Sequence, residues 1–512
     1  MKQASLALFL KTHRGLFILL ALAWLLRVAL CSRGGELFFP DENRYSEAYR
    51  VLYNLARGDW AGALDKILVI RAHVGFTLGA LIPAAIHALL VLTLGRPAVW
   101  PSFQETMWLA AAQTSLASVA CIGLCYALAL KLGAKRKEAL IAAALMACSN
   151  SMFYYSRHLL PYDSSLALGL LALWLMLEEP PGWKRSLFVG AAVALCLFTY
   201  LGYCFLALTI GAFYMIYRAQ SVFEILKRGA FLGAIGASLP AVMSLATWVR
   251  GSHLYALSVQ TFFEEDTLVV HQGDLAEGWT LPWTYLWHAE HGLLLVILLG
   301  AAATLCLALS RKKFNRGMLW LSLAAALYGA LAMTSSSLGL FPINARLSRQ
   351  ILPFLVLASA YGLSALAELL STRLPRPKAL AGMLAAAIIG QTAYNFARPF
   401  QLTFPWDFRR QIPAQYGRVS HALTVKADAY DPPDDKSTPY VLVNAQYLFP
   451  VLCAIQYPSG KVLMRAPHPL EFLPYQYDGH KPSARAILRS QDISMRLIER
   501  AAAKPQPDGQ SQ

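Results

Sequence analysis

A short charged run, PDENRYSEAYR, begins at position 40 and has the composition of a catalytic edge in an otherwise apolar chain. Asp41 and Glu42 are adjacent acids, and Arg44 follows closely enough to hold an anion beside a general base. The same run also fits a solvated helix beside a membrane, in which Glu47 and Arg50 form an i,i+3 ion pair. On pattern alone, both interpretations stay open.

Two later segments place cations and a carboxylate between apolar runs. The turn RHLLPYD holds Arg157, His158 and Asp163, and a second segment holds Arg346 and Arg349 beside an apolar run. Guanidinium groups bind phosphate through two hydrogen bonds, so such cations suit an anionic lipid phosphate. The alternative is that the arginines snorkel to lipid head groups and that Asp163 caps the helix that follows it.

Membrane helices are the elements that must position these residues. The chain has 512 residues, 57% hydrophobic and 14% charged, whereas soluble domains carry roughly 25% charged residues. The apolar residues form long blocks, which predicts a polytopic membrane protein. The net charge of +16 comes mostly from short loops between the blocks, as membrane topology produces. We therefore expect membrane lipids and phosphate-bearing substrates as partners, and no nucleic acid.

The apolar blocks predict about eleven spans and an N-terminus on the inner side. After the first span, the outer loop 32–105 contains an amphipathic helix and a further apolar block at 73–95. The next span, 106–130, ends at the basic sequence KLGAKRKE, which should be inside. The block 73–95 should then begin and end outside, so we expect it to re-enter. Counting the spans from the inner N-terminus places both cation-bearing segments on the outer side.

The chain is expected to have two domains and a tail. Residues 1–397 form the predicted transmembrane catalytic domain, and residues 398–503 form a small α/β domain on the outer side, with a strand-like run YVLVNAQYL. Residues 504–512 should be a disordered tail. The predicted fold class is thus an all-α polytopic membrane protein with an appended α/β domain. The eight cysteines lie mostly in apolar blocks, which predicts neither disulfides nor a zinc site.

Three segments together resemble a known family. PDENRYSEAYR resembles the first-loop motif of the polyprenyl-phosphate-sugar-dependent membrane glycosyltransferases, which include protein O-mannosyltransferases and the aminoarabinose transferases of lipid A. YYSRHLLPYDSSLALGLLALWL at 154–175 and NARLSRQILPFLVLASAYGL at 344–363 resemble later segments of that family. The resemblance covers roughly residues 10–400. It implies a GT-C type fold, with juxtamembrane helices in the first outer loop and an outward-facing site.

The resemblance also implies a reaction. A hexose or pentose would pass from a polyprenyl-phosphate carrier to a lipid, glycan or protein acceptor, with inversion, at the outer face of a multi-pass membrane protein. The bacterial inner membrane is the expected location. Asp41 is the implied general base, with Glu42 as the second catalytic acid. No cofactor is expected, and no metal is indicated, because the first loop has no Asp-x-Asp sequence.

The substrate-binding residues follow from the same resemblance. Where the family carries a Lys-Pro-Pro segment, this chain reads IRAHVGF, so Arg71 takes the place of the lysine, with His73 beside it. The leaving phosphate needs positive charge. The expected substrate-binding residues are Arg44, Tyr45, Arg71, His73, Arg157, His158, Asp163, Arg346 and Arg349.

A different class of protein fits part of the pattern. A transporter or flippase of lipid-linked saccharides would also have many spans and outward-facing arginines. Transporters usually carry ionisable residues near mid-span and repeated halves, and neither was found in this sequence. A membrane scaffold is a third reading. The long first loop and the C-terminal segment favour the enzyme.

Overall fold

The computed structural model shows a bundle of helices. It describes residues 11–32, 43–69, 74–95, 106–177, 183–249, 279, 281–311, 315–336, 345–373 and 377–401. Within these ranges the chain is helical and forms no strand. Seven of the described helices are long and apolar enough to cross a membrane, and two more apolar helices are shorter. The chain is therefore an all-α polytopic membrane protein, as predicted.

The described helices follow one another along both halves of the chain. The first half contains α2 (Arg14–Cys31), α3 (Asn43–Ala56), α4 (Trp60–Val69), α5 (Val74–Thr93), α7 (Met107–Thr114), α8 (Leu116–Lys131), α9 (Arg136–Cys148), α10 (Asn150–Tyr155), α11 (Tyr162–Met176) and α12 (Trp183–Thr199). The second half contains the 3-10 helix η2 (Leu201–Tyr203), α13 (Cys204–Ile216), α14 (Val222–Val249), α16 (Leu281–Glu290), α17 (Gly292–Arg311), α18 (Arg316–Ser336), the 3-10 helix η5 (Ala345–Ile351), α19 (Leu352–Arg373) and α20 (Pro377–Gln401).

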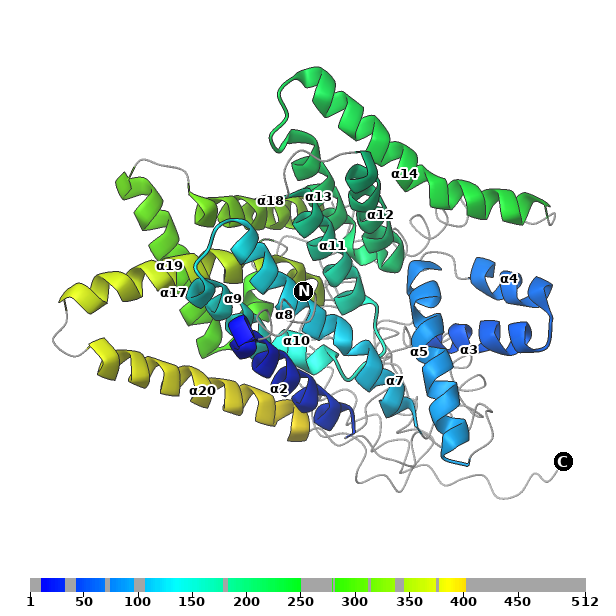
Figure 1. Cartoon of the computed structure of the whole chain (residues 1–512), viewed down its shortest axis with the longest axis horizontal. Helices are drawn as coiled ribbons and strands as arrows, with labels where there is room; N and C mark the ends of the chain where they lie inside the picture. Colours follow the sequence, from blue (N-terminus) through cyan, green and yellow to red (C-terminus); the bar gives the residue numbers. More distant parts are fainter. Residues whose placement is uncertain are drawn as a thin grey trace, which may run out of the picture.

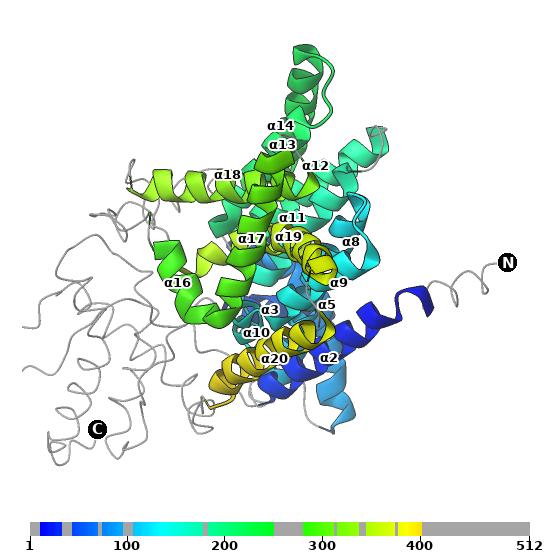
Figure 2. The same cartoon turned by 90° about the vertical axis from the view of Figure 1, so that its left-hand side faces the viewer.

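The core of the bundle joins early and late parts of the chain. One buried apolar cluster contains residues of α8, α9 and α11 together with residues of α17 and α19. Helices α3, α4 and α5 lie together on one flank, and α14 extends along the edge of the bundle (Figure 1). A view turned by 90° shows α2 and α20 running along the same side of the bundle (Figure 2). The predicted C-terminal domain lies outside the described residues, except for the end of α20.

The basic segment after α8, which the sequence predicts to be on the inner side, contacts two later parts of the chain. Lys135, after α8, pairs with Glu368 near the end of α19 at 2.6 Å. Arg316, at the start of α18, pairs with Glu138 at 2.6 Å and donates to the carbonyl of Gly133 at 3.0 Å. The segment after α8, the start of α18 and the last turns of α19 therefore meet at one end of the bundle, and the predicted sidedness stays a prediction.

Helix α5 differs from the expected re-entrant segment. It is one continuous helix of 20 residues that includes Pro83, and it is among the helices long enough to cross a membrane. A re-entrant segment turns back on itself, and α5 does not. The Tyr49 hydroxyl contacts Nδ1 of His87, and Nε2 of His87 is 2.8 Å from the Thr106 hydroxyl. This buried chain of polar groups fixes α5 against α3 and the start of α7.

The contact between α17 and α19 depends on glycine. A Cβ added to Gly362 of α19 would lie 1.9 Å from the carbonyl oxygen of Gly300 in α17. Near this contact, the Thr304 hydroxyl donates to the carbonyl of Ala358 at 2.7 Å. Small residues let membrane helices approach closely enough for such contacts. The two helices can therefore pack this tightly only without a side chain at position 362.

Gly362→Ala should lower the thermal stability of the purified protein. The added methyl group must push α17 and α19 apart, and overpacking of a close contact costs about 1–3 kcal/mol. The measurement is the melting temperature in detergent. Gly329→Ala in α18 is the matched control, because a Cβ there meets nothing within 4 Å. Equal melting temperatures for the two variants would contradict the prediction.

Candidate functional site

A buried ion pair joins the two cation-bearing segments. Nη2 of Arg349, in η5, donates to Oδ1 of Asp163 in the first turn of α11. Arg349 is fully buried and Asp163 is only 7% exposed. A carboxylate and a guanidinium taken out of water stabilise one another only when they are directly paired and hydrogen-bonded. The structure thus brings two of the predicted substrate-binding residues together, and their roles in binding stay predictions.

The local sequence explains where each partner of this ion pair lies. Pro161 precedes α11, and Asp163 lies in the first turn, where the positive end of the helix favours a carboxylate. No side-chain hydrogen bond caps α11 at Pro161, and the Asp163 carboxylate pairs with Arg349 across the fold. Arg349 is carried by a 3-10 helix of seven residues, which is longer than usual for this conformation.

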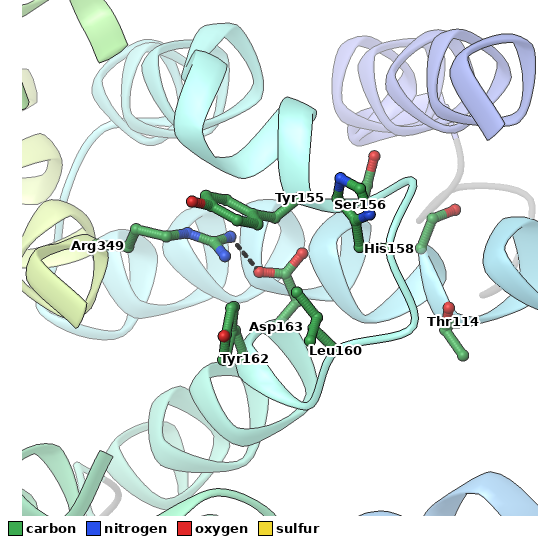
Figure 3. Close-up of a pocket in the computed structure, with 9 residues that line it drawn as sticks. Thr114, Tyr155, Ser156, His158, Leu160, Tyr162, Asp163 and Arg349 are labelled. Carbon is green, nitrogen blue, oxygen red and sulfur yellow. Dashed lines mark hydrogen bonds and ion pairs between the residues drawn. The ribbon is translucent and has the colours of Figure 1, made fainter. Parts of the chain in front are cut away.

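A polar pocket surrounds the ion pair (Figure 3). Its cavity volume is about 10 Å³, roughly the space that one water molecule needs. Tyr155 and Tyr162 both face the Arg349 guanidinium, whose central carbon is 4.9 Å and 5.8 Å from the two ring centres. Cation–π contacts of this kind hold a guanidinium in place in a water-poor site. The lining residues are Thr114, Ser115, Tyr155, Ser156, His158, Leu160, Tyr162, Asp163 and Arg349.

Arg157 and His158 are enclosed by protein. Arg157 has no exposed surface and His158 is 2% exposed. Nε2 of His158 is 3.1 Å from the Tyr154 hydroxyl, one turn earlier in α10. A snorkelling side chain keeps its charged end in water or among head groups, and neither Arg157 nor Arg349 does so. The snorkelling alternative is therefore wrong for these two arginines.

Helix α10, which leads into the turn before α11, is anchored at its start by a residue from much later in the chain. The carboxylate of Glu290, at the end of α16, accepts hydrogen bonds from the Ser149 hydroxyl at 2.8 Å, the Asn150 amide at 2.7 Å and the Ser151 amide at 3.0 Å. The Glu290 carbonyl accepts from the Asn395 side chain at 2.9 Å. Burial raises the pKa of the Glu290 carboxyl, and the hydrogen bonds to the carboxylate oppose that rise. Glu290 thus caps α10, which forms one wall of the pocket.

The helix that carries the first-loop motif packs against the same turn. Tyr45 in α3 is fully buried and lies edge-on to Tyr49, with ring centres 5.7 Å apart. Both tyrosines belong to one buried apolar cluster with Cys31, at the end of α2, and Leu159, between α10 and α11. The motif and the turn, more than a hundred positions apart, are therefore parts of one packed unit.

The exposed part of the motif behaves as the alternative interpretation predicts. Nη1 of Arg50 is 2.6 Å from a carboxylate oxygen of Glu47, which is the expected i,i+3 pair on the surface of α3. This pair leaves the roles of Asp41 and Glu42 untested, because it involves neither acid. The catalytic interpretation of the acidic end of the motif stays a prediction.

Several predicted site residues lie outside the described part of the chain. These are Asp41, Glu42, Arg71 and His73. Arg44 lies in α3 and Arg346 lies in η5. Among the residues that the structure describes, no group of three His, Cys, Asp or Glu side chains could hold a metal ion. The two acids of the motif are not in that set, so the expectation of metal-free chemistry stays a prediction.

Sequence reasoning missed several residues that shape the pocket. Tyr155 and Tyr162 were not distinguishable from core aromatics, and Glu290 had no signal because its partners are about 140 positions away. Arg27 was different, since it interrupts the apolar first span within LLRVALC. An ionisable residue inside a span is by default a functional candidate. That signal is visible in the sequence.

Comparisons with known proteins place the chain only loosely. A scan against protein-family models finds no match, and a search of curated proteins finds no matching relative. Among solved structures, the chain is similar to the oligosaccharyltransferase of Archaeoglobus fulgidus, crystallised with a tethered acceptor peptide containing the NVT sequon. The identity is 13%, the TM-score is 0.47, and the match covers 86% of this chain and 63% of the other. The chain thus spans less than two thirds of that protein, and this likeness carries no argument about activity.

Proposed function

We propose that the protein is a membrane glycosyltransferase that moves a sugar from a polyprenyl-phosphate carrier to an acceptor hydroxyl or similar group at the outer face of the membrane. The observation that carries the proposal is the buried Arg349–Asp163 pair in a polar pocket. The turn that forms this pocket packs against α3, the helix of the acidic first-loop motif. The transfer of a sugar from a lipid phosphate requires a cation, a carboxylate and an acidic motif.

The proposed mechanism uses one base and a set of cations. Asp41 takes the proton from the acceptor, whose oxygen attacks the anomeric carbon from the face opposite the phosphate. The bond between that carbon and the phosphate oxygen breaks, and both electrons leave with the lipid phosphate. Its charge needs stabilisation rather than a proton, and we assign this task to Arg349 with Arg346 and Arg71. Asp163 holds Arg349 in one orientation.

The side chains that line the rest of the pocket are mostly polar. The hydroxyl groups of Thr114, Ser115 and Ser156 and the imidazole of His158 line the pocket wall. Such groups both donate and accept hydrogen bonds, as the hydroxyl groups of a monosaccharide require. The acceptor, whether lipid, glycan or protein, is left open by these contacts.

A comparison of a deletion strain with its parent tests the proposal. A strain without this transferase should accumulate a lipid-linked monosaccharide on the outer leaflet, where a membrane-impermeant oxidant can reach it, and should lose one sugar from an envelope glycan, lipid or protein. Accumulation on the inner leaflet would instead support a transporter or flippase. Unchanged lipid-linked sugars and glycans would overturn the proposal.

A further inference from the structure

Arg27 is a buried cation in the first span. It lies one turn before the end of α2 and has no exposed surface. Its Nε donates to the Ser118 hydroxyl at 3.1 Å and its Nη1 donates to the Ala23 carbonyl at 2.9 Å. Its Nη2 is buried and finds no hydrogen-bond acceptor among the residues that the structure describes. A guanidinium in such a position is expensive in a membrane and is usually retained for a function.

The contacts of Arg27 lead to the Arg349–Asp163 pair. Ser118, which accepts from Arg27, donates to the backbone carbonyl of Met152 at 3.4 Å. The sulfur of the same Met152 is 3.1 Å from Nη2 of Arg349. The Arg27 guanidinium also lies 5.8 Å from the centre of the Phe153 ring, the next residue in α10. Arg27 and Arg349 therefore both contact the short stretch Met152–Phe153, Arg27 through Ser118.

Two arginines and one carboxylate meet around α10. Asp163 pairs directly with Arg349, and Arg27 reaches the stretch of α10 beside Arg349 through Ser118. The three groups together carry one net positive charge, whereas Arg349 and Asp163 alone would be neutral. In a low-dielectric site a single charge acts over several ångströms.

We propose that Arg27 is a positioning residue that acts through Ser118 and the Met152–Phe153 stretch, adding a buried positive charge near the Arg349–Asp163 pair so that the pocket stays positive enough to attract the phosphate of a lipid-linked substrate. The inference rests on the proposed function, because it takes a lipid phosphate as the substrate anion. It adds a residue from the first span to a site otherwise built from α10, α11 and η5. It also explains why a charge is buried in α2 beside groups that do not neutralise it.

Binding of two matched lipids to the purified protein in nanodiscs tests the proposal. The probes are a polyprenyl monophosphate and the uncharged polyprenol of the same length. We expect the wild-type protein to bind the monophosphate more tightly than the polyprenol. Arg27→Gln should reduce that preference about tenfold, and Arg27→Lys should keep most of it at neutral pH. Arg14→Gln is the matched control, because Arg14 lies on the same helix and is exposed.

A pH series within one variant keeps the test decisive if Arg27→Gln does not fold. A buried lysine loses its proton at alkaline pH, whereas arginine stays charged. The preference for monophosphate in Arg27→Lys should therefore fall between about pH 7.5 and pH 10, and the wild-type preference should not. An equal loss of affinity for both lipids, or an unchanged preference in Arg27→Gln, would overturn the role of Arg27 and leave the proposed function standing. A wild-type protein that does not prefer the monophosphate would overturn both.

Discussion

Asp163→Asn should destabilise the protein more than any other single change among the charged groups of the pocket. The Asp163 carboxylate pairs with Arg349, and Arg27 places a second buried positive charge near that pair. Asparagine leaves both guanidinium groups buried without that counter-charge, and breaking a buried ion pair from one side costs about 3–5 kcal/mol. We expect a large fall in melting temperature in detergent, together with loss of sugar transfer.

The melting temperature of Asp163→Asn is compared with those of two further variants. Arg349→Met should cost less stability, because Arg27 still places a buried positive charge near the Asp163 carboxylate, although it should also abolish transfer. Glu368→Gln is the control, since it breaks the exposed Lys135–Glu368 pair, and exposed pairs contribute about 0–1 kcal/mol. If Asp163→Asn melted at the temperature of Glu368→Gln, the carboxylate would not be the counter-charge that the geometry indicates.

Asp41→Asn should remove nearly all sugar transfer and leave the protein folded and able to bind the polyprenyl-phosphate donor. Asparagine keeps the shape and the hydrogen bonding of aspartate but cannot take a proton. General-base catalysis typically contributes about 10²–10⁴ in rate, so a loss of that size is expected in purified membranes. Donor binding, measured on the same preparation, separates a lost base from a lost site.

Glu42→Gln is the matched control for the base. Neighbouring residues point in different directions in a helix or a strand, so Asp41 and Glu42 should not be equivalent, and Glu42→Gln should lose less transfer. If Glu42→Gln were inactive and Asp41→Asn active, the roles of the two acids would be exchanged. If neither change reduced transfer, the glycosyltransferase proposal would fail and the transporter alternative would be taken up.

The sequence predicted the helical membrane fold because the relevant forces are local. Long apolar blocks and basic loops indicate helices and their alternation without knowledge of any contact. The basic loops after α8 and at the start of α18 do meet, through Arg316 and Glu138. The same reasoning on sidedness placed Arg349 and Asp163 at one end of the bundle, where they pair.

Contacts between distant segments were not predictable in the same way. From the sequence alone, Tyr155 and Tyr162 look like ordinary core residues, and only the structure shows that both rings contact Arg349. The shape of α5 was predicted incorrectly, because positive charge at a loop constrains sidedness but says nothing about whether an apolar block bends. Arg27 was overlooked because one charge hardly lowers the mean hydropathy of an apolar window, yet it is fully buried.

The capping of α10 by Glu290 has a consequence for biosynthesis. A membrane protein is made from its N-terminus, so α10 leaves the ribosome long before Glu290 and Asn395 exist. Until α16 docks, the hydroxyl and amide groups at the start of α10 lack the carboxylate that they contact in the folded protein. Arg349 is also made late. The pocket therefore takes its final form only after most of the chain has been translated. A nascent chain without its last third has no pocket that a substrate could occupy.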